Sequence, residues 1–469
     1  MSLRTRPALL AGTLASALVL AACGSDGDGD GGGGDGGATA GGSITVWTME
    51  SLPDRFAAQQ QMAADFTEAT GVEVELVGIE EAQAPQLIQS NALSGDLPDV
   101  MASFPLALVH QMGGLDMVDT ETTQAVIETL GEDTFDPAAL ELTSDGENQL
   151  SVPSDGWSQI LVYRTDLFDE AGLEPPTTYE ALETAAKTLT TGDQFGITIA
   201  TDASDVFTQQ SFEALALGNG CQLVEGDEIT IDSPACQETF RLYQALGSEY
   251  SPSGTQSVDS TRASYFAGQS AMVMWSTYIL DELAGLRDDA LPTCEECADD
   301  DAWLAENSGV VTTITGPDGE SAGSYGEIAS FVAINGDNAA GAQAFIEYMM
   351  SDAYVDWLAM APEGKTPMRT GDGENATAFS DAWGDLEAGV DRRAPLGEFY
   401  DEEVMGVLTS VGQTIDRWAL KEGQGELLGS FTAELPLATA VADMTGGGLS
   451  PEEAAGQVAE AAQQMLPDQ

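Results

Sequence analysis

The sequence predicts an α/β fold of two lobes, and three observations lead to this prediction. Apolar, β-prone runs alternate with amphipathic stretches of helical period from Ser43 onward. The β-α-β-α-β order of residues 43 to 102 implies a parallel sheet with right-handed crossovers. Residues 43 to 469 are also numerous enough to build two lobes, each with a core of its own.

The first five expected elements form one parallel unit. They are a strand, a helix, a strand, a helix and a strand, at residues 43–48, 55–70, 72–77, 84–94 and 97–102. Gly71 and Gly95 follow the two helices, where glycine commonly ends a helix. In such sheets ligands bind outside the carboxyl ends of the strands, which here are residues 47–51 and 103–105.

The stretch from Val152 to Leu189 predicts a buried strand followed by two helices. The strand is the mostly apolar run 158–163, and Gly172 ends the short helix after it. We expect Thr177 to cap the second helix, with Glu180 completing a capping box.

The same alternation continues to the C-terminus. Strands are expected at 195–199 and 328–334, and helices at 205–217, 235–246, 260–268, 338–350, 352–360 and 452–465.

The N-terminus predicts export and a lipid anchor. Arg4 and Arg6 precede an apolar run, 8–19, that is too short to span a bilayer. The segment Leu20-Ala21-Ala22-Cys23 has the pattern of a lipobox, so cleavage would leave Cys23 for lipidation. An ordinary secretory signal with a chance cysteine is the alternative. We therefore expect a lipoprotein signal peptide at 1–22 and a disordered Gly/Asp tether at 23–42.

The other four cysteines are consistent with an exported protein. Cys221 and Cys236 flank a predicted hairpin, and we expect a disulfide between them. Cys294 and Cys297 form a C-x-x-C without a thioredoxin-like context, which favours a local structural disulfide over redox work. His110 is the only histidine, so a zinc site would lack ligands, and no nucleophile is paired with it. We expect no metal, no cofactor and no catalytic residue.

The charge is strongly acidic, with 14 Lys and Arg against 79 Asp and Glu. This balance argues against a nucleic-acid binder and against a protein that seeks anionic membrane surfaces. Such a surface repels itself at low salt, which suggests a host that lives in salt. An acidic surface that does not depend on salt is the alternative.

Several segments resemble a known family. The stretch from Val152, VPSDGWSQILVYRTDLFDEAGLEPPTTYEALETAAKTL, is similar to the crossover segment of extracellular solute-binding proteins of ABC importers, in the branch of maltose and multiple-sugar binders (bacterial solute-binding protein family 1). SGDLPDV, AQAFIEYMMSDAYVDWLA and GKTPMRTG resemble further segments of that family. The resemblance implies a two-lobed periplasmic-binding-protein-like fold (type II), in which each lobe is a mainly parallel sheet flanked by helices and the cleft lies between the lobes. Lobe one would comprise 43–151 and 325–370, and lobe two 152–324 and 371–469.

The resemblance also implies a function. The protein would be a monomer, anchored by lipid alone to the outer face of the cytoplasmic membrane. It would capture a mono- or oligosaccharide and deliver it to the permease subunits of an ABC importer. The alternatives are a polyamine, which suits acids and aromatics, or a glycerol phosphodiester, for which Arg262 and Arg369 are the candidate ligands. A surface glycoside hydrolase and an adhesive lipoprotein are less favoured.

Sugar sites combine aromatic stacking with carboxylates and amides. The resemblance places Tyr278 at the family's aromatic position, with Trp275 three residues earlier, and leaves open which ring faces the cleft. The expected ligand-binding residues are Trp157, Tyr278, Asp155, Glu50, Ser51, Ser103, Phe104, Gln210, Tyr325 and Trp275. Trp47, Phe207 and Phe431 are further aromatics for which a core position is equally open.

The acidic balance generates one prediction. The melting temperature of the mature chain should rise from low to molar NaCl or KCl, because salt screens the repulsion between surface carboxylates. A thermal melt across that range measures this, and a melting temperature that does not rise would contradict the salt interpretation.

Overall fold

The computed structural model describes residues 42–319 and 323–466. The expected signal peptide, Cys23 and all of the tether except Gly42 lie outside these residues. Among the helices in the described ranges, none has the length and apolar character that crossing a membrane requires.

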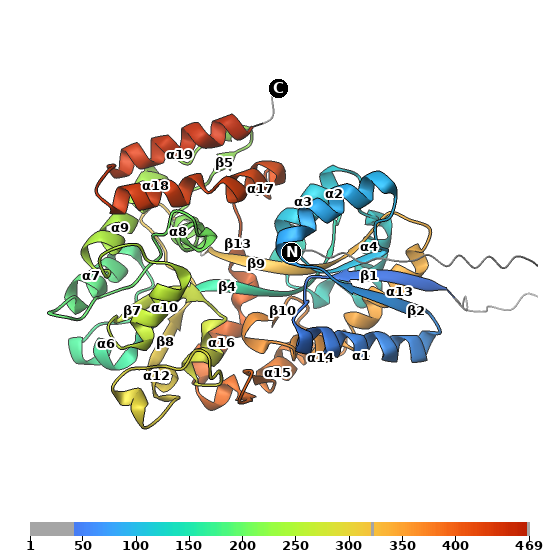
Figure 1. Ribbon diagram of the computed structural model, residues 1–469, viewed down its shortest axis with the longest axis horizontal. Helices are drawn as coiled ribbons and strands as arrows, with labels where there is room; N and C mark the ends of the chain where they lie inside the picture. The colour runs from blue at the N-terminus through green and yellow to red at the C-terminus, as the bar shows by residue number, and fades with distance from the viewer. Residues whose placement is uncertain (1–41, 320–322, 467–469) are drawn as a thin grey trace, which may run out of the picture. The chain divides into compact units, whose positions relative to one another are not determined.

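A sheet of nine strands runs through the described residues (Figure 1). Its main path is β10-β4-β9-β3-β1-β2, while β7 and β8 pair with β4 and β13 pairs with β9. The strands are β1 Ser43–Thr48, β2 Glu73–Gly78, β3 Val100–Pro105, β4 Val152–Arg164, β7 Met272–Ser276, β8 Ser308–Val311, β9 Ser324–Ala333, β10 Thr366–Pro367 and β13 Ile415–Asp416.

The predicted β-α-β-α-β unit is confirmed. β1 pairs in parallel with both β2 and β3. The connecting helices are α1 (Pro53–Thr70) and α2 (Ala84–Ser94). Gly71 and Gly95 end them in the left-handed region, with φ of 77° and 79°. α1 begins two residues earlier than expected because Pro53 suits the first helical position. β3 begins at Val100, after the proline of SGDLPDV, whose nitrogen cannot donate to a ladder.

β4 joins the two ends of the sheet and is longer than the predicted run 158–163. Its first half pairs antiparallel with β9, and its second half pairs antiparallel with β7 and β8. Pro153 and Gly156 made the first half look like a loop in the sequence. Pro153 lies at a shift of register, where the ladder tolerates it, and a Cβ on Gly156 would lie 2.9 Å from both Glu327 O and Met368 Cε.

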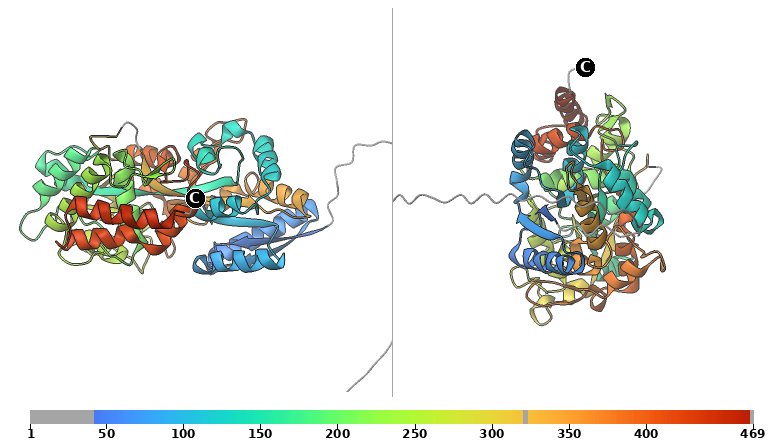
Figure 2. Two further views of the ribbon diagram at one scale, coloured as in Figure 1. Left: turned by 90° about the horizontal axis from the view of Figure 1, so that it is seen from above. Right: turned by 90° about the vertical axis from the view of Figure 1, so that its right-hand side faces the viewer.

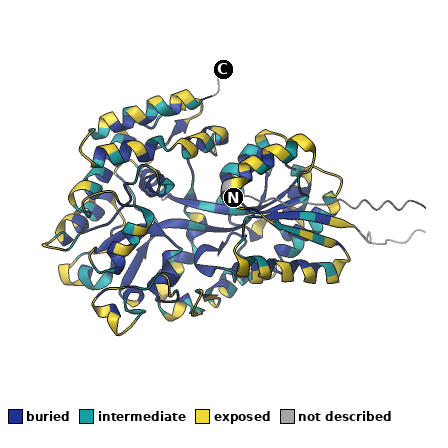
Figure 3. Cartoon of the chain, in the orientation of Figure 1, coloured by how far each residue is buried: buried dark blue, intermediate teal, exposed yellow. Residues whose placement is uncertain are grey.

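Helices cover the strands on both sides of this junction. The helices of the crossover and later segments include α6 Thr165–Ala171, α7 Tyr179–Leu189, α8 Val206–Gly218, α9 Pro234–Glu249, α10 Val258–Phe266, α13 Ala339–Met349, α14 Tyr354–Leu358, α17 Gly425–Glu434, α18 Pro436–Thr445 and α19 Pro451–Met465. α18 and α19 lie side by side in Figure 1 and also when the molecule is seen from above (Figure 2). The strands are mostly buried, whereas the outward helix faces are exposed (Figure 3).

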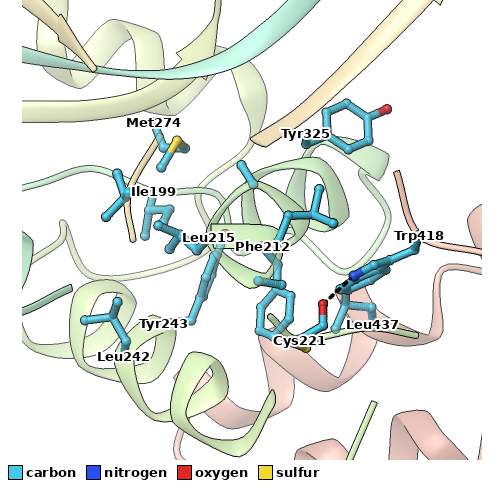
Figure 4. Close-up of a cluster of buried hydrophobic side chains, with 14 of the residues drawn as sticks. Ile199, Phe212, Leu215, Cys221, Leu242, Tyr243, Met274, Tyr325, Trp418 and Leu437 are labelled. Atoms are coloured by element: carbon cyan, nitrogen blue, oxygen red, sulfur yellow. Dashed lines mark hydrogen bonds between the residues drawn. The ribbon is translucent and has the colours of Figure 1, made fainter. Parts of the chain in front are cut away.

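The largest core packs around α8. The ring of Phe212 lies 4.5 Å from that of Phe240 and 5.4 Å from that of Tyr243, measured between centroids. Trp418 donates its indole N–H to the carbonyl of Cys221 at 2.8 Å, which ties the C-terminal segment to this core (Figure 4). Tyr325 lies at the edge of the same cluster.

Two local predictions are wrong. Thr178, and not Thr177, caps α7, because its hydroxyl accepts from Ala181 N at 3.2 Å. The backbone of Thr177 is held instead by Thr315, and the expected capping box does not form. The expected strand 195–199 is present only as isolated bridges at Phe195 and Thr198.

Both expected disulfides are confirmed. Cys221 is bonded to Cys236, and Cys294 to Cys297. The first bridge encloses the hairpin of β5 (Val224–Glu225) and β6 (Glu228–Ile229). Ser233 is the N-cap of α9, and its side chain accepts a hydrogen bond from the backbone N–H of Cys236.

The two bridges should differ in how much they stabilise the fold. Replacing Cys221 and Cys236 by serine should lower the free energy of unfolding by about 3 kcal/mol, because that bridge closes a loop with a sequence separation of 15. The Cys294→Ser/Cys297→Ser variant is the matched control, and its loss should be smaller by about 1 kcal/mol because its loop is shorter. Denaturant unfolding measures both losses. A larger loss in the control would contradict the loop-closure explanation.

Candidate ligand-binding site

A cavity of about 430 Å³ lies where β4 and β9 meet the carboxyl ends of β1 and β3. Glu50 enters it from the loop that follows β1, and Ser103 from the second half of β3, at the edge where the sequence predicted a site. Trp157 comes from β4, Tyr325 from β9 and Gln210 from α8. Segments far apart in the chain therefore build one pocket.

Three aromatic rings form one wall of the cavity. The ring centroid of Trp157 lies 6.1 Å from that of Tyr278 and 5.8 Å from that of Tyr325. Trp157 and Tyr278 are half-buried, so part of each ring remains accessible. Burial raises the pKa of Tyr278 to about 12, although Lys365 opposes this, so the phenol stays neutral at ordinary pH. Such a wall suits the weakly apolar face of a ring-shaped ligand.

A buried lysine holds two of the cavity's carboxylates. Lys365 Nζ lies 2.6 Å from Glu50 Oε1, 3.1 Å from Asp155 Oδ2 and 4.5 Å from the centre of the Trp357 ring. Its side chain is only 1% exposed. Burial alone would lower the pKa of Lys365, but Asp155 and Glu50 outweigh burial and raise it. The lysine is therefore charged.

Glu50 and Asp155 use all four of their oxygens within the protein. Arg55 Nη1 binds Glu50 Oε2 at 2.9 Å. Burial would raise the pKa of Glu50, but Lys365 and Arg55 outweigh it and lower the pKa to about 2. The second oxygen of Asp155 accepts from Trp357 Nε1 at 2.5 Å and from Ser154 Oγ at 2.7 Å. Both carboxylates are fixed in place before any ligand arrives.

Arg417 packs against the ring of Tyr325 and is itself held by two carboxylates. The guanidinium of Arg417 lies 4.5 Å from the centre of the Tyr325 ring. It binds Glu327 Oε2 at 2.6 Å and Glu213 Oε1 at 3.4 Å, and Leu106 N donates to the other oxygen of Glu327 at 2.8 Å. Burial raises the pKa of Glu213, against the effect of Arg417. The segment after β13 thus fixes one side of the aromatic wall.

The structure brings most of the expected ligand-binding residues together. Those that line the cavity are Glu50, Ser103, Asp155, Trp157, Gln210, Tyr278 and Tyr325. Phe104 does not, because it points into a core with Met101 and Val332 and is fully buried. Trp275 also faces a core, where its indole N–H donates to Val258 O at 3.1 Å.

Other expected residues also lie outside the lining. Ser51 donates to Glu80 Oε1 at 3.3 Å. Arg262 is paired with Glu282 at 2.6 Å, and the guanidinium of Arg369 donates to Met350 O and Leu130 O. The remaining aromatics, Trp47, Phe207 and Phe431, belong to hydrophobic cores.

The sequence interpretation missed the charges that surround the aromatic wall. These residues are Arg55, Glu81, Glu327, Lys365 and Arg417. One signal was available, since lysine occurs only three times in this chain and a lysine in GKTPMRTG is therefore unusual.

Among the residues that the structure describes, neither a three-residue metal cluster nor the single histidine is found in the lining of this cavity. Across residues 42–319 and 323–466, no group of three His, Cys, Asp or Glu side chains could hold a metal ion. His110, on α3 (Leu106–Gly114), bonds through Nε2 to Leu142 O at 2.8 Å. Burial lowers its pKa, so it is mainly neutral near pH 7.

Comparison with known proteins identifies the family. Residues 50–356 match the bacterial extracellular solute-binding protein family. The chain belongs to this family. The match includes β3, β4, β7 and β9, and with them Trp157, Tyr278 and Tyr325 of the aromatic wall.

Curated relatives and solved structures agree. The chain is 27% identical over 311 residues to YcjN, an Escherichia coli (strain K12) protein named for the periplasmic-binding component of an ABC transporter, covering 64% of this chain and 67% of YcjN. It is 28% identical to the diacetylchitobiose binding protein DasA of Streptomyces coelicolor, over 50% of this chain and 55% of DasA. The cyclic α-maltosyl-1,6-maltose binding protein of Arthrobacter globiformis superposes with a TM-score of 0.68 at 18% identity, covering 90% of this chain and 98% of that one. The two-lobed periplasmic-binding-protein fold is confirmed.

The buried lysine generates the first prediction of this site. Lys365→Met should lower the free energy of unfolding by about 3–5 kcal/mol, because Asp155 and Glu50 lose their shared cation inside the protein. Lys421→Met is the matched control: Lys421 is 37% exposed, and its pairs with Glu141 and Asp416 should contribute at most about 1 kcal/mol. Denaturant unfolding at fixed salt measures both variants, and similar losses would contradict the buried network.

Two buried acidic residues, Asp281 and Glu363, lie on the segments next to Tyr278. Asp281 is on α11 (Ile279–Leu283) and Glu363 is on the short helix Pro362–Gly364, where Gly364 touches the Tyr278 ring. Within the described part of the chain, both carboxyl oxygens of Asp281 and one of Glu363 have no hydrogen-bond partner. Burial, with the charges of Glu363 and Glu282, raises the pKa of Asp281 to about 8.

This acid pair makes stability depend on pH. The folded state keeps a proton on Asp281 that the unfolded chain releases near pH 3.8, so stability should fall as pH rises from about 4 to about 8. Asp281→Asn should remove this part of the decline, because the amide cannot ionise. Unfolding curves at several pH values measure the difference, with Asp299→Asn as an exposed control. Identical pH profiles for Asp281→Asn and wild type would contradict the prediction.

Proposed function

We propose that this chain is a lipid-anchored solute-binding protein that captures a carbohydrate and delivers it to an ABC import permease. One observation carries the proposal: three aromatic rings from separate strands and loops form one wall of a 430 Å³ cavity whose rim is polar. A mono- or oligosaccharide fits this chemistry, because its ring has an apolar face and hydroxyls around the edge. Family membership and the sugar named for DasA support it.

The charges of the cavity argue against the rival solutes. A polyamine needs several free carboxylates, but Glu50 and Asp155 are already bound by Lys365 and Arg55, and Glu327 by Arg417. A phosphate diester needs free cations, and those same two cations are engaged. Arg262 and Arg369 hold other partners away from the cavity. The ring and hydroxyl groups of a sugar remain the better match.

The same contacts argue against a glycoside hydrolase. Hydrolysis needs one carboxyl group that can donate a proton and a second that can act as base or nucleophile. Glu50 is held ionised, with its pKa at about 2, and both oxygens of Asp155 and of Glu327 are occupied, so Glu81 has no second free carboxylate beside it in the cavity. We therefore propose a binding role without covalent chemistry.

We further propose the lobe boundaries expected from the sequence, with 43–151 and 325–370 in one lobe and 152–324 and 371–469 in the other. Support comes from three strands at which the chain passes between the two regions: β9 and β10 both pair with β4. Bending at these strands would close the cavity around its ligand, and the importer would distinguish the closed form from the open one. The protein would act as a monomer at the outer face of the cytoplasmic membrane, attached through Cys23.

A thermal-shift screen of the mature chain, residues 23–469, in high salt tests the proposed function. The panel contains mono- and oligosaccharides, polyamines, glycerol phosphates and amino acids. One class of sugar should raise the melting temperature, because a ligand that binds only the folded state stabilises it. Trp157→Ala should abolish the shift, since it removes the centre of the aromatic wall.

Trp303→Ala provides the control. Trp303 stacks on Arg164 outside the cavity, so this variant should keep the full shift. A shift only with polyamines would contradict the assignment of a sugar, and a folded protein that responds to no compound would contradict solute binding altogether.

A further inference from the structure

Four carboxylates line the cavity, and three of them are fully engaged by the protein. Glu50 binds Lys365 and Ser103 through one oxygen and Arg55 through the other. Both oxygens of Asp155 are bound, as described above. Glu327 accepts from Leu106 N through one oxygen and from Arg417 through the other. None of these three carboxylates has an oxygen without a protein partner for a ligand to bind.

Glu81 is the exception. It lies at the start of the short helix Glu81–Gln83, on the connection that follows β2. Among the described residues its carboxylate forms no ion pair and no hydrogen bond, yet it lines the cavity. Desolvation and the nearby charge of Glu327 raise its pKa, because both disfavour the negative form.

The balance of charge around the cavity also singles out Glu81. Lys365 and Arg55 compensate Glu50 and Asp155, and Arg417 is shared by Glu327 and the buried Glu213. The charge of Glu81 has no such partner. Closing the cavity over a neutral ligand would strip water from this carboxylate, which costs free energy, whereas one positive charge on the ligand would remove that cost.

We propose that the ligand is an amino sugar and that Glu81 binds its protonated amine. This inference rests on the proposed function and specifies its substrate class. The aromatic wall of Trp157, Tyr278 and Tyr325 takes the sugar ring, and Glu81 forms a charge-assisted hydrogen bond to the ammonium group. Acetylation of the amine removes both the charge and two of its donors, so the N-acetyl sugar binds more weakly. A polyamine has more positive charges than this single carboxylate compensates.

Isothermal titration calorimetry on residues 23–469 in high salt tests the inference. The ligands are glucosamine, N-acetylglucosamine and glucose, with the corresponding β-1,4-linked disaccharides. The amine forms should bind about tenfold more tightly than the matched N-acetyl and hydroxyl forms, as expected for a charged hydrogen bond. Glu81→Gln should reduce this ratio to about one while changing the affinity for the hydroxyl sugars by about twofold or less.

Glu80→Gln is the matched control. Glu80 is the neighbouring residue and is exposed, as Glu81 is, but it does not line the cavity, so removing its charge tests the general attraction of surface carboxylates for cations. The control should keep the tenfold preference.

Three results would overturn the inference. Equal or tighter binding of the N-acetyl or hydroxyl sugars would do so and leave the proposed function standing. A preference that survives in Glu81→Gln would assign it to the surface charge instead. If no sugar binds to the folded protein, the proposed function fails, and the inference fails with it.

Discussion

One buried ammonium group organises the cavity. Within the part of the chain that the structure describes, Lys365 is the only cation that contacts both Glu50, just after β1, and Asp155, near the start of β4. Without it, Asp155 would lose its ion pair and Glu50 would keep only Arg55, which would leave buried negative charge poorly compensated. The residue before it, Gly364, supports the ring of Tyr278. The positions of the carboxylates and of one aromatic ring therefore depend on a single lysine.

The chain has only 14 basic residues, and three of them surround this cavity. In the whole chain 79 Asp and Glu outnumber them. Arg55, Lys365 and Arg417 neutralise carboxylates that would otherwise turn the pocket into a general cation site. In the proposed account, selectivity therefore depends on the aromatic wall and on the one carboxylate without a cation, that of Glu81.

Local patterns predicted the elements well and the site in part. The strand-helix alternation, the helix-ending glycines and the Cys221–Cys236 bridge follow from neighbouring residues, and the rule for the carboxyl ends of parallel strands found Glu50 and Ser103. The side toward which Phe104 and Trp275 point depends on packing partners distant in sequence, which no local pattern contains. Lys365 and Asp155 are separated by 210 residues, so only the folded chain shows that they meet. Thr178 displaced Thr177 as a cap because Thr315 binds the backbone of Thr177.

A crystal structure of the mature chain with a bound sugar tests the central claim most directly. The account predicts one sugar in the cavity, with a ring face against Trp157 and with Lys365 still bound to Glu50 and Asp155. A sugar bound outside this cavity, or a ligand that displaces Lys365 from its two carboxylates, would contradict the account.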